Sequence, residues 1–189
     1  MKDNLTLAKA SFERHSRAVQ KAAPLVGALV TVAQKMGDLL LAGGKVMMMG
    51  NGGSAADAQH FAAELVVRYK KDRAGFAAIA LNTDSSILTA EGNDHSFNSI
   101  FSRQIEALAR KGDMVFAFST SGNSANVVEG VLEAKRRGCF TVGFLGRDGG
   151  ELKPLVDVPL VVEDEETARV QEVHGLMYHI LCELFEDRL

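Results

Sequence analysis

Five short apolar runs punctuate the chain, and most of them lead into a polar loop. The runs are apolar throughout rather than alternating, which is typical of strands in a parallel sheet covered on both faces. Their alternation with helical segments predicts a doubly wound α/β fold with five parallel strands and helices on both faces. The predicted strands are residues 45–49, 77–81, 114–118, 140–145 and 158–162.

Apolar residues at helical spacing predict the elements around these strands. The first two helices are expected to form an antiparallel pair, the second beginning at Pro24 and ending at Gly43-Gly44. The predicted helices are residues 4–22, 24–42, 54–68, 125–137 and 166–189.

A length of 189 residues favours one compact domain. We therefore expect a single domain over residues 1–189, in which N-terminal helices at 1–44 precede an α/β core at 45–189 that includes the C-terminal helix. The net charge is −3 and the basic residues are thinly spread, so nucleic acid is not expected to be a partner.

The chain shows no export or membrane signal. Cys139 and Cys182 form no CxxC pair or disulfide framework, which suits a reducing cytoplasm. Residues 1–20 lack an apolar core of the signal-peptide type, and the longest apolar stretch, Leu25 to Ala33, is too short to span a membrane. A cytoplasmic protein without a membrane segment is expected.

Glycine is over-represented, at 18 of 189 residues, and much of the excess lies where strands end. The segment Gly50-Asn51-Gly52-Gly53-Ser54-Ala55 joins the first strand to a helix, where backbone N–H groups can hold a phosphate. It matches G-x-G-x-x-A, but no acid ends a second strand about twenty residues later, as a dinucleotide site would need. No Walker motif occurs, and a simple tight turn stays open as an alternative.

A second polar loop, residues 119–124, occupies the equivalent place after the third strand. Its sequence Ser-Thr-Ser-Gly-Asn-Ser offers four hydroxyls to phosphate oxygens, and Ser124 can also cap the next helix. The loop could be only a cap and turn. Because ligands bind at the carboxyl ends of strands in open α/β sheets, two such loops favour a phosphorylated small molecule.

Acid and imidazole side chains follow these loops. His60 and Glu64 stand four residues apart and share one helix face. The last helix adds Gln171 and His179, about 12 Å apart along its axis and some 80° around it, so they meet over one point only by leaning together. His174 fits that face less well and is expected to be capped or exposed to solvent. The set suits proton transfer beside a carbonyl, and it also suits zinc, although glutamine is an uncommon ligand.

The chain resembles sugar isomerase (SIS) domains and, among them, the bacterial phosphoheptose isomerase family, over essentially its whole length. STSGNS is general to SIS domains, whereas its combination with His60, Glu64, Gln171 and His179 is more specific. The resemblance implies a three-layer sandwich of flavodoxin-like or Rossmann-like type. It is carried by GNGGSAADAQHFAAEL at 50–65, EGNDHSFNSIFSRQ at 91–104, STSGNSANV at 119–127, GRDGGEL at 146–152 and ARVQEVH at 168–174.

The resemblance also implies roles for residues. Glu64 matches the general base and His179 its acid–base partner, while His60, Glu64, Gln171 and His179 match zinc ligands. Some family members have an acid where this chain has Ala168, so we assign no role there beyond Gln171. The positions that match substrate contacts are Asn51, Gly52, Gly53, Ser54, His60, Glu64, Asn93, Asp94, Ser119, Thr120, Ser121, Ser124, Gln171 and His179.

The family implies an activity and an assembly. The activity is the aldose–ketose isomerisation of D-sedoheptulose 7-phosphate to D-glycero-D-manno-heptose 7-phosphate through an enediol, the first step toward ADP-heptose and the heptose of lipopolysaccharide core. The assembly is a homotetramer with active sites at subunit contacts, in which the helices at 1–44 are expected to take part.

Two rival classes are considered. A non-enzymatic SIS regulator that binds the bacterial replication initiator has similar segments at 58–63 and 78–84, but it lacks the acid and histidine that match Glu64 and His179. Phosphosugar-sensing transcription factors need a DNA-binding domain, for which the 44 residues before the first strand are too few and too weakly basic. The acid and histidine favour the isomerase.

Overall fold

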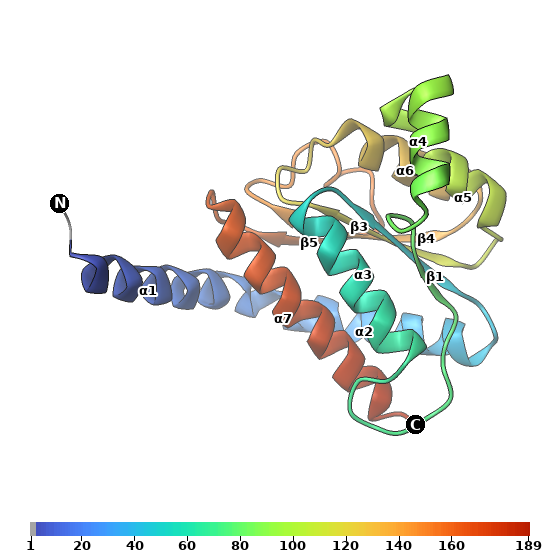
Figure 1. The fold of residues 1–189 in the computed structure, drawn as a ribbon. Helices are drawn as coiled ribbons and strands as arrows, with labels where there is room; N and C mark the ends of the chain where they lie inside the picture. Colours follow the sequence, from blue (N-terminus) through green and yellow to red (C-terminus); the bar gives the residue numbers. More distant parts are fainter. Residues whose placement is uncertain (1–2) are drawn as a thin grey trace.

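The structure, a computed structural model, describes residues 3–189 and has a five-stranded parallel sheet between two layers of helices (Figure 1). The strand order is β2-β1-β3-β4-β5, which confirms the predicted doubly wound α/β fold. Residues 1 and 2, which the predicted domain included, lie outside the described residues. The strands are β1 (Val46–Gly50), β2 (Ala78–Ala80), β3 (Met114–Ser119), β4 (Phe140–Gly146) and β5 (Val158–Val162).

The helices include two that the sequence did not predict, α4 and α5. Asp84 caps α4 by accepting from the Ile87 N–H, and this capping residue is the signal that could have located the helix. Glu91 is the one buried residue of α4, so the helix carries no apolar stripe. The helices are α1 (Asn4–Ala22), α2 (Val26–Leu41), α3 (Gly53–Val66), α4 (Ser85–Asp94), α5 (Ser102–Leu108), α6 (Ala125–Arg136) and α7 (Thr167–Glu186), with 3-10 turns η1 (Ala23–Leu25) and η2 (Phe97–Ser99).

Alternate residues of the central strands enter two separate cores. Met48 and Phe116 pack with α2, α3 and α7, whereas Met47 and Val115 pack on the opposite face with α5 and α6. Both faces of the sheet are therefore buried, which explains why the strands are apolar throughout. The layering leaves the carboxyl ends of the strands as the free edge on which a site can form.

The prediction of an antiparallel pair for the first two helices is wrong. Helices α1 and α2 follow each other in nearly the same direction through η1, and α1 projects from the body (Figure 1). Pro24 occupies the first turn of η1, where its missing N–H costs no hydrogen bond. Ala23 and Val26 keep right-handed helical angles, so nothing at the junction reverses the chain.

The continuous stretch Asn4–Leu41 is, within residues 3–189, the one helix long and apolar enough to cross a membrane, with a mean hydropathy of 1.3 over its most apolar 18 residues. A core helix passes the same test. Leu29, Val32 and Met36 of α2 are buried in the core beside α7, which accounts for the apolar character of this part of the helix. The apolar run recognised in the sequence, Leu25 to Ala33, is only a part of this stretch.

Candidate active site

A polar cavity of about 310 Å³ opens where β1 and β3 end. The register pairs Gly50 of β1 with Phe118 of β3, so the loops that follow these strands begin side by side. This is the juxtaposition that the two polar loops predicted. The cavity is lined by Asn51, Gly52, Gly53, Ser54, Phe118, Ser119, Thr120, Ser124, Thr167 and Gln171.

The glycine-rich loop delivers the N-terminus of α3 to this cavity. Gly52 precedes the helix with a φ of 57°, a conformation that favours glycine, and no side chain caps the helix. At Gly53 a Cβ atom would stand 2.4 Å from the Gln171 side chain, so only glycine admits this contact without a shift. The uncapped N–H groups and the positive helix end suit an anion.

The Ser/Thr loop is held by its own hydrogen bonds and by contact with the segment at 149–150. The Ser119 hydroxyl accepts from the Gly122 N–H at 3.1 Å and lies 3.1 Å from the Ser124 hydroxyl. Ser124 precedes α6 but makes no side-chain cap, so its expected second role is absent. Gly122, with a φ of 69°, lies against Gly149, whose carbonyl oxygen would be 2.0 Å from an added Cβ. The segment at 149–150 thus supports the loop by close backbone contact.

An amide bridge links the two loops. The Asn51 amide donates to the Asn126 oxygen at 2.8 Å, and the Asn126 amide donates back to the Asn51 oxygen at 2.9 Å. Only 3% of the surface of Asn126 is exposed. Asn126 and the cavity residue Thr167 were not predicted from the sequence. The position of Asn126, two residues after the Ser/Thr loop, is the signal that could have identified it. The bridge fixes the spacing of the loops.

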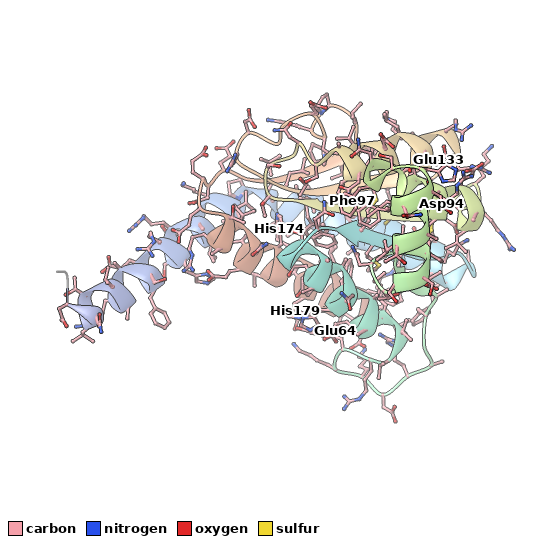
Figure 2. The ribbon with its side chains drawn as sticks, turned by 45° about the horizontal axis from the view of Figure 1, so that its top comes forward. Glu64, Asp94, Phe97, Glu133, His174 and His179 are labelled. Carbon is pink, nitrogen blue, oxygen red and sulfur yellow. The ribbon has the colours of Figure 1, made fainter. Side chains whose placement is uncertain are left out.

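Farther along α3, an acid and two imidazoles converge. The His60 Nε2 atom lies 2.9 Å from Glu64 Oε1, and one donor atom each from His60, Glu64 and His179 lies within 4.8 Å of the others. Figure 2 shows Glu64 and His179 beside each other, contributed by α3 and α7. The structure therefore joins the residues that resemblance matched to the general base and its partner.

Burial and charge tune this cluster. Burial lowers the pKa of His179, and the nearby His60 lowers it further, while Glu64 acts in the opposite direction. Burial raises the pKa of Asp57, one turn before His60 on α3, to about 6, against the opposing charge of His60. A lowered pKa keeps His179 largely neutral near pH 7, as a group that both accepts and donates protons requires.

Tyr69 covers the cluster, and a buried ion pair holds the loop of Tyr69. The Tyr69 ring stacks on His179 with centroids 5.6 Å apart. Its loop is held by Glu186, which accepts from the N–H groups of Tyr69, Lys70 and Lys71 and pairs with Arg73 at 3.0 Å. Burial by itself raises the pKa of Glu186, but these donors outweigh it and bring the pKa to about 2. None of these residues was predicted to belong to the site.

The other predicted residues of α7 separate into two environments. Gln171 contacts Gly53 and lines the cavity, two helical turns before His179. The expectation that His174 is capped or exposed is wrong: its side chain is fully buried, and its Nε2 lies 3.2 Å from the Leu145 oxygen. Position 174 faces the sheet, where Phe118 and Phe144 surround the imidazole.

Some predicted substrate contacts lie outside the cavity. Asn93 and Asp94 end α4, where the Asn93 amide donates to the Asp94 carboxylate at 2.8 Å. Asp94 stands apart from Glu64 and His179 in Figure 2, and neither α4 residue lines the cavity. The Ser121 hydroxyl accepts from the Asn123 N–H within its own loop. Within one chain, these three residues are not brought to the cavity lining.

The donor chemistry at the cluster fits a metal. Two imidazole nitrogens and a carboxylate oxygen are ligands that zinc takes in proteins, and three protein ligands leave a position for another donor. The donor atoms of His60, Glu64 and His179 are close enough to share one ion after small rotations. The three residues can therefore hold a divalent cation between α3 and α7.

Comparison with known proteins identifies the family of the chain. The SIS domain model matches residues 10–146, a range that holds both loops and α3 but not α7. A phosphoheptose isomerase of Geobacter sulfurreducens is 55% identical over 165 residues, covering 87% of each chain.

Two solved structures have the same architecture. A phosphoheptose isomerase structure from Neisseria gonorrhoeae superposes with a TM-score of 0.93 at 43% identity, covering 98% of this chain and 100% of the other. One from Francisella tularensis gives 0.94 at 33% identity, covering 98% and 99%. The chain therefore belongs to the phosphoheptose isomerase family of SIS-domain proteins.

Proposed function

We propose that this protein interconverts D-sedoheptulose 7-phosphate and D-glycero-D-manno-heptose 7-phosphate, and so supplies the first intermediate toward ADP-heptose and lipopolysaccharide core heptose. The observation that carries the proposal is the convergence of His179 of α7 with His60 and Glu64 of α3, the helix whose N-terminus opens at the polar cavity. His60 lies about 10 Å along α3 from Gly53, a span suited to an extended sugar phosphate.

The phosphate is assigned to the cavity. Backbone N–H groups at Gly52 and Gly53 and the hydroxyls of Ser54, Ser119, Thr120 and Ser124 offer donors without a lysine, which suits a monophosphate at a helix end. Asn51 and Gln171, which also line the cavity, complete this set of proposed contacts. Ser121 is a further proposed contact that would have to exchange its bond to the Asn123 N–H for the phosphate. Binding energy from the phosphate, remote from the reacting carbons, orients C1 and C2 at Glu64.

The acid and imidazoles move the protons. Glu64 removes a proton from C1 of the open-chain ketose while the C2 oxygen gains one, which gives the enediol. Return of a proton to C2 and loss of the proton on the C1 oxygen give the aldose. His179 handles the oxygen protons, a role that fits its lowered pKa.

Zinc is the proposed cofactor, held by His60, Glu64 and His179 with Gln171 as a fourth ligand. Bound there, zinc polarises the carbonyl oxygen as a Lewis acid. Glu64 has two carboxylate oxygens, so one can serve as a ligand while the other accepts a proton. This fourth ligand requires a different side-chain rotation of Gln171 from the one that contacts Gly53.

The proposed assembly is a cytoplasmic homotetramer. Helix α1 projects from the body (Figure 1). Its side chains Leu5, Leu7 and Phe12 are exposed, and so is Phe97 of η2, which follows α4. Apolar surface of this kind on a projecting helix suits contact with further copies. Such contacts can bring Asn93 and Asp94 to the cavity of a neighbour, which is how we account for their distance from the site in one chain. Sedimentation equilibrium that gives a monomer mass would exclude the assembly.

Turnover of sedoheptulose 7-phosphate by the purified, zinc-supplied protein tests the proposal. Glu64→Gln should lower kcat by about 10²- to 10⁴-fold, because it removes the base and keeps the shape. Glu183→Gln makes the same change at an exposed site of α7 and should keep the parent rate. An inactive parent would exclude the isomerase, and an active Glu64→Gln would exclude the assigned base. No observation favours the regulator that binds the replication initiator.

A further inference from the structure

We propose that Tyr178 is a positioning residue for His60. The Tyr178 hydroxyl binds Nδ1 of the His60 imidazole and thereby directs Nε2 toward Glu64 and the metal. The inference rests on the metal component of the proposed function. It concerns a residue that neither the sequence motifs nor the cavity singled out.

The contacts of His60 divide its two ring nitrogens. Nε2 lies 2.9 Å from Glu64 Oε1, on the side of the cluster, and Nδ1 lies 2.9 Å from the Tyr178 hydroxyl oxygen. The imidazole is thus held at both nitrogens by groups from two different helices. A half-exposed histidine, with 49% of its side chain accessible, would otherwise rotate freely about its side-chain bonds.

The chemistry of a neutral imidazole fixes the direction of these contacts when a metal binds. Nε2 must then present its lone pair to the ion, so the ring proton resides on Nδ1. The Tyr178 oxygen accepts that proton as a hydrogen bond, since a phenol both donates and accepts. Such a partner fixes the tautomer and ring orientation of a ligating histidine.

Packing keeps the tyrosine itself in place. Only 3% of Tyr178 is exposed, and its ring stacks on Phe61 at a centroid distance of 5.5 Å and meets the edge of His60 at 5.4 Å. Helix α7 carries both Tyr178, which supports the proposed ligand His60, and the adjacent His179, which is a proposed ligand itself. A shift of α7 would move both together.

A partly buried carboxylate shares α3 with His60. Asp57 precedes His60 by about one turn on α3, and its Oδ2 atom is buried without a hydrogen-bond partner among the described residues. When the Tyr178 oxygen accepts from His60, its own O–H becomes free to donate. Burial and, after it, the charge of Asp57 raise the pKa of Tyr178, so this carboxylate acts on the hydroxyl although no hydrogen bond joins the two groups in this structure.

The test measures zinc affinity by competition with a chromophoric chelator and the visible spectrum of the cobalt(II)-substituted protein. Tyr178→Phe removes the hydroxyl and keeps the ring against Phe61. We expect its zinc affinity to fall about 10- to 100-fold, as for other lost partners of ligating histidines, with an altered cobalt spectrum. Thr31→Val removes an exposed hydroxyl of α2, outside the cluster, and should keep the zinc affinity and cobalt spectrum of the parent.

The outcomes separate this inference from the proposed function. Metal-free Tyr178→Phe should unfold cooperatively within a few degrees of the parent, so that a loss of affinity reports on His60 rather than on the fold. A parent that binds zinc together with a Tyr178→Phe variant that binds it equally well overturns the inference and leaves the isomerase in place. A parent that binds no zinc overturns both the metal assignment and this role of Tyr178.

Discussion

Two histidines five residues apart on α7 have opposite surroundings. His174 is fully buried between the rings of Phe118 and Phe144, and its only protein partner within the described residues is the Leu145 carbonyl. His179 is partly exposed, lies beside His60 and Glu64 and is covered by Tyr69. Five residues rotate a helix by about 140°, so one imidazole faces the sheet and the other faces α3.

The difference shows that burial and function are separable along one helix. Burial lowers the pKa of His174 to about 4, against the weaker opposing effect of its bond to Leu145, and the side chain is a neutral part of the core. Burial also lowers the pKa of His179, but there the neighbouring His60 and Glu64 belong to the chemistry. A lowered histidine pKa therefore indicates a catalytic group here only when acidic and imidazole neighbours accompany it.

The largest expected effect is a loss of turnover when His179 is replaced. His179→Gln should reduce kcat for the heptose phosphate by about 10²- to 10⁴-fold, because the acid–base group is lost. Its melting temperature should stay close to that of the parent, since the imidazole is only partly buried. Steady-state kinetics and differential scanning calorimetry measure both. Parent-like turnover would move the proton transfer to another group.

The reciprocal change is expected at His174. His174→Ala should destabilise the fold by about 2 kcal/mol, because it leaves a cavity between two phenyl rings and an unpaired carbonyl. Urea unfolding measures the loss, and turnover per folded molecule should be retained. Leu176→Ala, at an exposed position of the same helix, controls for helix propensity. A catalytic defect in folded His174→Ala would show that the two histidines are not separable.

Acid sensitivity sharpens the contrast further. Between about pH 6.5 and pH 4 the unfolded chain protonates residue 174 while the folded chain does not. His174 therefore lowers stability as the pH falls through this window, by about 1.4 kcal/mol per pH unit. His174→Gln should have a shallower dependence of unfolding free energy on pH than the parent over the same range. Equal slopes would mean that His174 titrates normally in the fold.

The smallest expected effect concerns the cover over His179. Tyr69→Leu removes the stacked ring and should cost about 1 kcal/mol of aromatic contact, or about fivefold in kcat. The change should leave the pH dependence of unfolding that comes from His174 unaffected, because the Tyr69 ring stacks on His179 and not on His174. Single-turnover rates at saturating substrate measure it. A rate equal to that of the parent would make the stacking a packing contact only.

Much of the fold could be predicted because it depends on local patterns. Apolar runs located five strands, and the glycines at 50–53 placed a helix N-terminus at a strand end. Helix α4 was missed because its one buried residue is an acid, so no apolar stripe marks it. The prediction of an antiparallel helix pair was wrong because Pro24 can begin a new helical segment without changing the direction of the chain.

The sequence by itself determined which chemistry was present: two phosphate-type loops, and an acid and imidazoles at helical spacing. Only the tertiary structure decided which of these groups meet, because the angle at which α7 crosses α3 brings His179 to Glu64 and turns His174 into the core. The roles of Asn126, Tyr178 and Glu186 were likewise decided by the tertiary structure. Each acts through a partner at least 75 residues away in the chain, a distance that no local pattern reports.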